Sequence, residues 1–228
     1  MGRIRGIIIL IQFSITVAIT IALMYMFRNH THKVIKVWMK IQMKFLGITL
    51  ETEGKLDDSC DMVMLNHQSL LDIIVMEHIH PKDLAWVAKK EISDLFFFGH
   101  IIKAPRMISI DRENKAGIMT LLKETKDRLN KGRPIAMFPE GTRSNGKEIL
   151  SFKPGAKMVA NKHGLKVQPV LLFNTKSILD SQKLIAKPGI VKVIYLDPVQ
   201  ADKKTDWFEQ MEKDMNEAFQ KEIKNHVA

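Results

Sequence analysis

Two short polar segments of this 228-residue chain carry residue types that can do chemistry. In the first, NHQSLLD at residues 66–72, His67 precedes Asp72 by five positions. Imidazole exchanges a proton readily near neutral pH, and a buried carboxylate can fix its tautomer and stabilise its protonated form. The spacing predicts that His67 lies in a turn and that Asp72 lies in the first turn of the next helix, with Ser69 as N-cap. The same Ser-x-x-Asp spacing also suits a capping box, and the two roles of Asp72 are compatible.

The second segment, FPEGTRS at residues 138–144, follows a strand-like run about seventy residues later. Its proline cannot extend the strand, and Gly141 allows the backbone to approach a ligand closely. Exposed N–H groups in such a turn, with the Thr142 hydroxyl and the Arg143 guanidinium, predict a phosphate site. Glu140 would bind a substrate hydroxyl or hold Arg143.

Other cations lie outside these two segments. Arg112 follows a predicted strand, with Lys103 and Arg106 just upstream, and Lys153 lies in a Lys-Pro-Gly turn. A solvated charge cluster is the alternative interpretation for each of these groups.

Several competing chemistries are disfavoured. Residues 141–147 read G-x-x-x-x-G-K, but Glu148 follows where a nucleotide-binding loop needs Ser or Thr. No G-x-S-x-G elbow is present. The single cysteine, Cys60, precedes an apolar run without a cationic neighbour, so we expect an inert thiol and no internal disulfide. A base without a protein nucleophile suggests that His67 deprotonates a substrate hydroxyl directly.

The composition indicates the kind of partner. The formal net charge is +10, which favours an anionic membrane surface, phosphorylated substrates or an acidic carrier protein. No nucleic-acid-binding motif accompanies the basic residues, so we expect no nucleic-acid partner. The histidines at positions 30, 32, 78 and 80 lack a recognised ligand spacing, and we expect no metal and no cofactor.

The positioning elements follow from hydrophobic periodicity. The predicted strands are Thr49–Glu53, Asp61–Leu65, Leu84–Ala88, Met107–Ile110, Ile135–Phe138, Val167–Phe173 and Ile190–Leu196. The predicted helices between and after them are Leu70–Ile79, Lys115–Asn130, Pro154–His163 and Asp206–Lys224. This alternation predicts a single α/β domain over residues 48–228, with a mostly parallel or mixed sheet flanked by helices. Asn66 and His67 then lie at a strand exit, where sheet-based sites are usually built.

Residues 1–47 predict a pair of membrane-anchoring helices. The apolar run at 7–27 contains 21 uncharged residues, a helix of about 31 Å that roughly matches the hydrocarbon thickness of a bilayer. Polar residues at positions 12, 16 and 20 form a line that could face a second helix. Whether this helix spans the membrane or lies in one leaflet stays open. If it spans, the following Lys/Arg-rich segment places the rest of the chain in the cytoplasm.

The second predicted helix, residues 32–46, is basic and amphipathic. Lys33, Lys36, Lys40 and Lys44 fall on one stripe, and Trp38 suits the membrane interface. Such a helix is typical of docking on anionic lipid, although an ordinary surface helix has a similar pattern.

Four segments in order resemble the conserved blocks of the glycerolipid acyltransferase family. NHQSLLD is similar to its Asn-His-x-x-x-x-Asp signature, and FPEGTRS matches its Phe-Pro-Glu-Gly-Thr-Arg-Ser block at every position. RMISIDR, residues 106–112, resembles its Gly-x-Ile-Phe-Ile-x-Arg block, with Arg106 in place of glycine and Ser109 in place of phenylalanine. VQPV, residues 167–170, resembles its fourth block, and AKKEI, residues 88–92, resembles a connecting segment.

The resemblance implies direct acyl transfer without an acyl-enzyme. Together with the anchor and the basic segment after it, we expect a protein of the inner membrane with its catalytic domain in the cytoplasm. His67, oriented by Asp72, would deprotonate the sn-2 hydroxyl of 1-acyl-sn-glycerol-3-phosphate (lysophosphatidic acid). The resulting alkoxide would attack acyl carrier protein or CoA thioesters to make phosphatidic acid.

The resemblance also assigns the remaining site residues. On the acceptor side it implies Arg112, Glu140, Gly141, Thr142 and Arg143, and we expect Asn66 and Lys153 as further substrate-binding residues. Pro169 and Val170 would line the acyl pocket. The alternatives are another lyso-lipid acceptor (a lyso-ornithine lipid or a lysophospholipid), a membrane-tethered thioester hydrolase, and a non-catalytic lipid- or carrier-binding protein.

Overall fold

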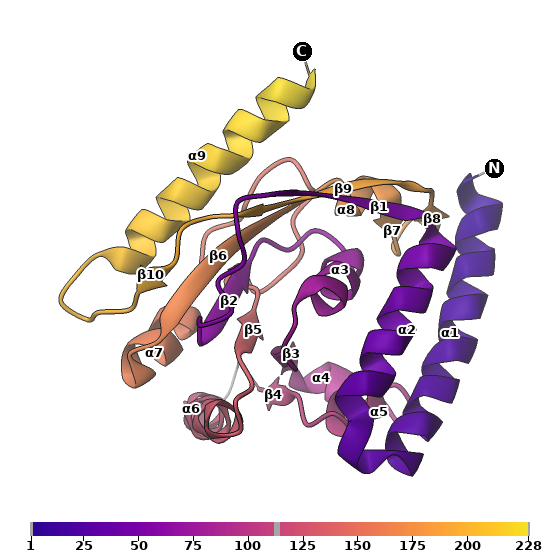
Figure 1. Cartoon of the computed structure of the whole chain (residues 1–228), viewed down its shortest axis with the longest axis horizontal. Coiled ribbons are helices and arrows are strands. Elements are labelled where there is room, and N and C mark those ends of the chain that lie inside the picture. The colour runs from indigo at the N-terminus through magenta and orange to yellow at the C-terminus, as the bar shows by residue number, and fades with distance from the viewer. Residues whose placement is uncertain (1, 112–114, 228) are drawn as a thin grey trace.

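The computed structural model describes residues 2–111 and 115–227, with side chains described for 4–111 and 117–225. Its core is an eight-stranded mixed sheet with helices on both faces (Figure 1). The strands in spatial order are β1 (Ile48–Glu53), β9 (Gly189–Tyr195), β6 (Lys166–Phe173), β2 (Met62–Leu65), β5 (Ile135–Met137), β3 (Ala85–Lys89) and β4 (Ile108–Ile110), with β10 (Val199–Gln200) paired to β6. The predicted fold class is therefore confirmed.

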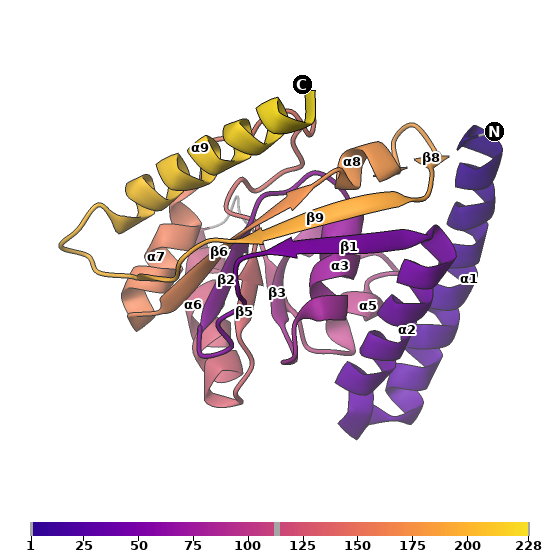
Figure 2. The ribbon, with the colours of Figure 1, turned by 45° about the horizontal axis from the view of Figure 1, so that its top comes forward.

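The two sheet faces bury different sets of side chains. Along β2, Val63 and Leu65 join one hydrophobic cluster, whereas Met62 and Met64 join the other, as the alternation of a strand requires. The first cluster includes side chains of α1 (Gly2–Met26), α2 (Thr31–Leu46) and α3 (Leu71–Ile79). The second includes side chains of α6 (Lys115–Asn130), α7 (Pro154–His163) and α9 (Trp207–Val227). Figure 2 shows α1 and α2 across the molecule from α9.

Strand direction brings the polar segments together. β2 pairs in parallel with β5, and β3 pairs in parallel with β5 and β4. The carboxyl ends of these strands therefore lie at one edge of the sheet, and the segments that follow them, which begin at Asn66, Phe138 and Lys90, leave from that edge.

The predicted strands agree with the structure within one residue at each end, but the short elements were not predicted. These are η1 (Arg28–His30), α4 (Lys90–Ser93), α5 (His100–Lys103), α8 (Thr175–Ile178), β10, and the hairpin of β7 (Leu179–Asp180) and β8 (Ile185–Ala186). Each is too short to show a period in sequence. The division at residue 47 stays a prediction, and the first hydrophobic cluster continues across it.

The polar residues at positions 12, 16 and 20 of α1 lie on the side of the helix that packs against α2. The Oγ1 of Thr16 accepts a hydrogen bond from Nε2 of Gln42 on α2 at 3.1 Å, and Thr20 is buried. Both ends of the helix contact the α/β body or the end of α2: a guanidinium N–H of Arg5 donates to the Leu46 carbonyl at 2.9 Å, and the Tyr25 hydroxyl lies 2.6 Å from Nδ1 of His100. By length and composition, Ile4–Met26 is the one helix of the described chain apolar enough to cross a membrane.

The lysine stripe on α2 is interrupted. Lys33, Lys40 and Lys44 are exposed as predicted. Lys36 instead points inward, and its ammonium group donates to the backbone carbonyls of Glu77 and His80 at the end of α3. Including Lys36 in a lipid-facing stripe was wrong, because an ammonium group there satisfies carbonyls that the helix end leaves unpaired.

Candidate active site

His67 lies at the exit of β2, and its ring is fixed by Asp72. Nδ1 lies 2.8 Å from Oδ2 of Asp72, whose side chain is fully buried. The same oxygen accepts the backbone N–H groups of Gln68 at 2.7 Å and Ser69 at 2.8 Å. Because the carboxylate presents only an acceptor here, we assign the proton to Nδ1, which leaves Nε2 as a proton acceptor.

The helix start differs from the predicted one by one residue. Helix α3 begins at Leu71 with Leu70 as N-cap, and the Ser69 hydroxyl donates instead to the Leu179 carbonyl at 2.6 Å. Ser69 Oγ also accepts the Leu71 N–H at 3.2 Å. Asp72 still satisfies backbone N–H groups as a capping residue would, so its capping and orienting roles coexist.

The segment 138–144 holds His67 from a second side. Oε1 of Glu140 accepts the His67 backbone N–H at 2.5 Å, and the Ser144 N–H donates to the His67 carbonyl at 2.8 Å. The Phe138 ring stacks on the imidazole with centroids 3.7 Å apart. The two polar segments therefore meet through the backbone and the ring of one residue.

Glu140 fixes the backbone of His67 and has no free carboxylate oxygen. Its side chain is buried, and its Oε2 accepts the Leu150 N–H at 2.7 Å, so each carboxylate oxygen has a protein partner. Burial raises the pKa of this carboxyl to about 7. We expected Glu140 to bind a substrate hydroxyl or Arg143. In the structure both of its carboxylate oxygens instead accept backbone N–H groups, those of His67 and Leu150.

Asn66 is also occupied by the protein. Its amide donates to the Leu172 carbonyl at 3.0 Å and accepts the Leu172 N–H at 2.7 Å, which ties the end of β2 to β6. This pairing corrects the expectation of a substrate contact.

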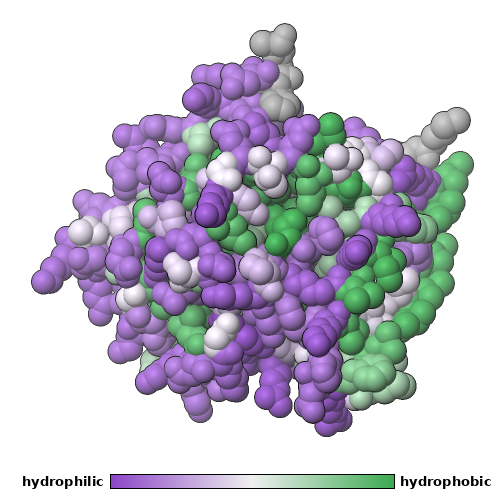
Figure 3. Space-filling view, in the orientation of Figure 1, coloured by the Kyte–Doolittle hydropathy of each residue, from purple (hydrophilic) through white to green (hydrophobic). Residues whose placement is uncertain are grey.

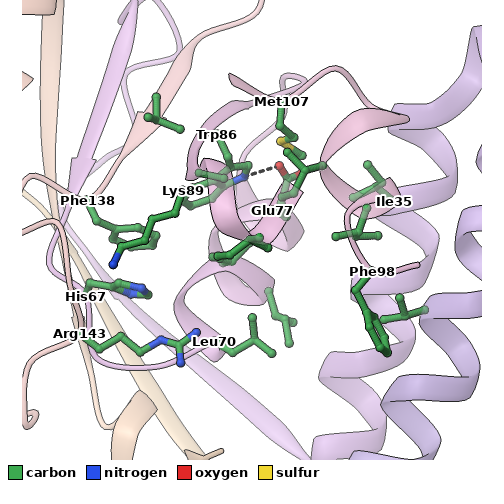
Figure 4. Close-up of a pocket in the computed structure, with 18 of the residues that line it drawn as sticks. Ile35, His67, Leu70, Glu77, Trp86, Lys89, Phe98, Met107, Phe138 and Arg143 are labelled. Carbon is green, nitrogen blue, oxygen red and sulfur yellow. Dashed lines mark hydrogen bonds between the residues drawn. The ribbon is translucent and has the colours of Figure 1, made fainter. Parts of the chain in front are cut away.

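An apolar cavity of about 510 Å³ opens beside His67 (Figure 4). This volume is within the range of small-molecule sites. Its walls come from α1, α2, α3, β3 and the 92–107 segment, and include Phe13, Ile35, Trp38, Ile73, Ile101 and Met107. His67, Gly141, Thr142 and Arg143 line one part of the cavity, and Glu77 and Trp86 line another.

Other predicted site residues lie elsewhere. Pro169 and Val170 are buried in β6 and belong to the sheet rather than to the cavity wall, which corrects the expected acyl pocket. Lys153 is exposed and outside the cavity lining, and its backbone N–H donates to Pro139. Arg112 lies outside the described residues.

Lys89 is a site residue that the sequence analysis did not assign. It ends β3, at the same sheet edge as His67, and its exposed side chain lines the cavity. Figure 4 shows it reaching towards His67 and Phe138. A cation directly after a buried strand was the available signal, together with the family-like segment AKKEI. Lys89 and Arg143 place two positive charges beside the imidazole.

The two commonest protein nucleophiles are missing from the cavity lining. Among the described residues that line the cavity there is no serine or cysteine, although the Thr142 hydroxyl is part of it. Cys60 lies outside the cavity lining, and burial raises the pKa of its thiol to about 11. Within 2–111 and 115–227, no group of three or more His, Cys, Asp and Glu side chains is placed to hold a metal ion.

The cavity contains one buried acid, Glu77, whose pKa is raised to about 7 by burial. Because the folded protein then holds this proton more tightly than the unfolded chain does, the group destabilises the fold as pH rises from about 4.5 through about 7. We expect Glu77→Gln to gain stability relative to wild type over that interval, by on the order of 3 kcal/mol. Urea unfolding in detergent at several pH values between 4.5 and 8 measures the difference. Parallel stability curves for the two proteins would contradict it.

The site thus combines an imidazole held by a buried carboxylate with two cations at the mouth of an apolar cavity that has no serine or cysteine in its described lining. That arrangement suits attack by a substrate hydroxyl on a group carried by an amphiphile. The profile of a protein family described as Acyltransferase matches residues 48–172. The chain belongs to this acyltransferase family.

Individual relatives agree with this assignment. A 1-acyl-sn-glycerol-3-phosphate acyltransferase of Helicobacter pylori is 42% identical over 177 residues, which cover 77% of this chain and 75% of that protein. The protein of the same name from Salmonella typhimurium is 34% identical over 135 residues, 59% of this chain and 54% of its own length. The crystal structure of the 1-acyl-sn-glycerophosphate acyltransferase PlsC from Thermotoga maritima superposes with a TM-score of 0.77 at 25% identity, covering 100% of this chain and 98% of that one.

Proposed function

We propose that this acyltransferase moves a fatty acyl group from an acyl thioester to the sn-2 hydroxyl of 1-acyl-sn-glycerol-3-phosphate, forming phosphatidic acid. The relatives named above carry this activity in their names. The observation that supports it best is the position of His67, whose unprotonated Nε2 is beside both an apolar cavity and two cations.

The chemistry then follows from the ring geometry. Nε2 of His67 accepts the proton of the acceptor hydroxyl while that oxygen attacks the thioester carbonyl, and Asp72 stabilises the imidazolium through Nδ1–H. Collapse of the tetrahedral intermediate breaks the carbon–sulfur bond, and the imidazolium returns its proton to the leaving thiolate. The backbone contacts of Glu140 and Ser144 hold His67 in place during both steps.

The acceptor phosphate and the donor acyl chain each have a suitable part of the site. The guanidinium of Arg143 and the ammonium of Lys89 would hold the acceptor phosphate, with Gly141 and Thr142 beside them. A contribution from Arg112 rests on the family resemblance. The apolar cavity would take the acyl chain of the donor, carried by acyl carrier protein or CoA.

Membrane association is supported by a continuous apolar surface. The outer face of α1 exposes isoleucines at positions 4, 8, 11, 15 and 19, and green side chains follow that edge of the molecule in Figure 3. On α2, Val37, Ile41 and Phe45 are exposed beside the lysines. Residues 96–98, three consecutive phenylalanines next to α5, are exposed too, with Phe96 at 97%.

The contacts of α1 favour a position within one leaflet. Because both its ends contact the α/β body or α2, a spanning α1 would draw polar surface of that body into the hydrocarbon. We therefore propose that α1 lies along the surface of the inner membrane, with the α/β body in the cytoplasm, where the anionic leaflet suits the basic chain.

The lysines of α2 provide a test of this surface. We expect replacement of Lys33, Lys40 and Lys44 by glutamine to weaken binding to anionic vesicles, most clearly at low salt, since each basic residue near such a surface contributes about 1 kcal/mol. Vesicle sedimentation at several salt concentrations measures the effect. The same substitutions at Lys203, Lys204 and Lys221, which are exposed in or near α9, are the matched control. Equal losses in both triple variants would contradict the proposed face.

The reaction itself is tested by transfer of labelled acyl groups from acyl carrier protein and from CoA to lysophosphatidic acid in micelles. Phosphatidic acid is the expected product. Free fatty acid without phosphatidic acid would instead favour a hydrolase, and turnover only on another lyso-lipid would change the acceptor.

A further inference from the structure

The tip of the β7–β8 hairpin places a free amide group at the mouth of the cavity. Gln182 lies in this tip, its side chain is exposed, and it lines the cavity together with Thr142 and Arg143. Within the described chain its backbone N–H donates to Oδ1 of Asp180 at 3.0 Å, whereas its side-chain amide has no hydrogen-bond partner. The reaction steps above leave this amide unused.

The hairpin begins beside the turn that carries His67. The Ser69 hydroxyl donates to the carbonyl of Leu179, the first residue of β7, at 2.6 Å. Gln182 follows only three residues later, so it lies within about 10 Å of that residue even if the chain between them is extended. The hairpin therefore brings its amide to the end of the cavity where His67 lies.

Helix α1 fixes the shape of the hairpin tip. Leu184 has a φ of 52°, in the left-handed region that a bulky side chain rarely adopts, so its surroundings must hold it there. Gly6 supplies that contact, because a Cβ at position 6 would collide with the Leu184 carbonyl oxygen. Figures 1 and 2 show β8 beside the first turns of α1. Helix α1 thus positions the loop that carries Gln182.

The acceptor has one polar group that the site residues named so far do not bind. Lysophosphatidic acid carries a phosphate, a free hydroxyl and the carbonyl of its 1-acyl ester. The first two are assigned to Arg143 with Lys89 and to Nε2 of His67. A carbonyl oxygen only accepts hydrogen bonds, and it costs free energy when it leaves water without finding a donor. The amide N–H of Gln182 is a neutral donor at the same cavity mouth, and α1 beside it borders the proposed membrane surface.

We propose that Gln182 is a specificity-determining residue whose amide donates to the ester carbonyl of the acceptor lipid, with Gly6 as its positioning residue. This inference rests on the proposed function. An acceptor whose chain is joined through an ether has no carbonyl oxygen, so it cannot use this donor. The enzyme should therefore prefer 1-acyl over 1-alkyl acceptors, and the amide rather than the cations should set that preference.

The test compares kcat/KM for 1-acyl- and 1-alkyl-sn-glycerol-3-phosphate of equal chain length, with the same thioester donor. In wild type we expect the 1-acyl acceptor to be favoured about threefold to tenfold, the range for one neutral hydrogen bond. Gln182→Glu keeps the size of the side chain but removes both N–H donors, and Gln182→Leu removes every polar atom, so the preference should disappear in each. Lys183→Gln changes the exposed neighbour in the same tip, outside the cavity lining, and should keep the wild-type ratio.

A Gly6→Ala variant tests the positioning by α1. Alanine favours a helix more than glycine does, so α1 keeps its own structure while the added Cβ displaces the hairpin tip. The preference for the 1-acyl acceptor should then fall although residue 182 is unchanged. A wild-type ratio in Gly6→Ala would overturn the positioning role.

An unchanged ratio in the Gln182 variants, even with lower activity towards both acceptors, would overturn the inference, as would a wild type that does not distinguish them. Should wild type transfer no acyl group to either acceptor, the proposed function fails separately. The contact is then judged by the dissociation constants of the two lipids from wild type and from Gln182→Leu, where loss of the same preference is expected and equal discrimination by both proteins would overturn it.

Discussion

Replacing His67 with alanine is expected to lower kcat of acyl transfer by about 10²–10⁴-fold, because in the proposed mechanism the imidazole removes the proton of the attacking hydroxyl. We assign Nε2 as its unprotonated nitrogen; Asp72 and Phe138 hold the ring, and Glu140 accepts the backbone N–H of the same residue. The alanine variant retains the cavity and both nearby cations. The KM for each substrate should therefore change much less than kcat does.

The measurement is initial-rate kinetics of phosphatidic acid formation with each thioester donor. Asp72→Asn keeps the size of the side chain but presents an N–H group in place of one acceptor oxygen, so it should also lower kcat, by disturbing the tautomer. His30→Ala is the control, since His30 is exposed in η1. Wild-type kcat in His67→Ala, with unfolding unchanged, would sink the assignment of the base.

The second large effect is expected at Arg143 and Lys89, the two cations proposed to bind the acceptor phosphate. Arg143→Gln or Lys89→Gln should each reduce kcat/KM for lysophosphatidic acid about 10- to 100-fold, because hydrogen bonds between charged groups contribute about 1.5–3 kcal/mol each. Arg143→Lys should recover only part of this loss, since an ammonium group cannot make the paired contacts of a guanidinium.

The comparison that isolates the phosphate uses a 1-acylglycerol acceptor, which lacks that group. Its turnover should be insensitive to both substitutions, whereas turnover of lysophosphatidic acid falls. Lys153→Gln is the matched control, because Lys153 is an exposed cation outside the cavity lining. Equal losses for the two acceptors would show that these cations support the site without binding phosphate.

The sequence alone determined the local elements and the chemical parts. The main strands and helices follow from the periodicity of apolar residues, which depends on neighbours within one or two turns. The position of His67 at a strand exit and its pairing with Asp72 follow in the same way, because the two residues are only five positions apart.

The tertiary structure decided what those parts do for one another. Glu140 and His67 are 73 positions apart, and Asn66 meets Leu172 across 106, so neither pairing is visible in a local pattern. Both depend on the strand order that places β2 between β5 and β6. The same order sets Lys89 beside His67 and leaves Pro169 and Val170 inside the sheet.

The N-terminal helices α1 and α2 show the same division between what the sequence determines and what the tertiary structure decides. Their sequence determined an apolar helix followed by a basic amphipathic one, and periodicity placed four lysines of the second helix on one stripe. Only the packing of α2 against α3 turned Lys36 inward, and only the packing of α1 against α2 decided that the Thr16 face meets Gln42. A residue's helical face is a local property. Which neighbour that face meets depends on contacts between distant segments, and buried polar groups select the arrangement in which they are paired.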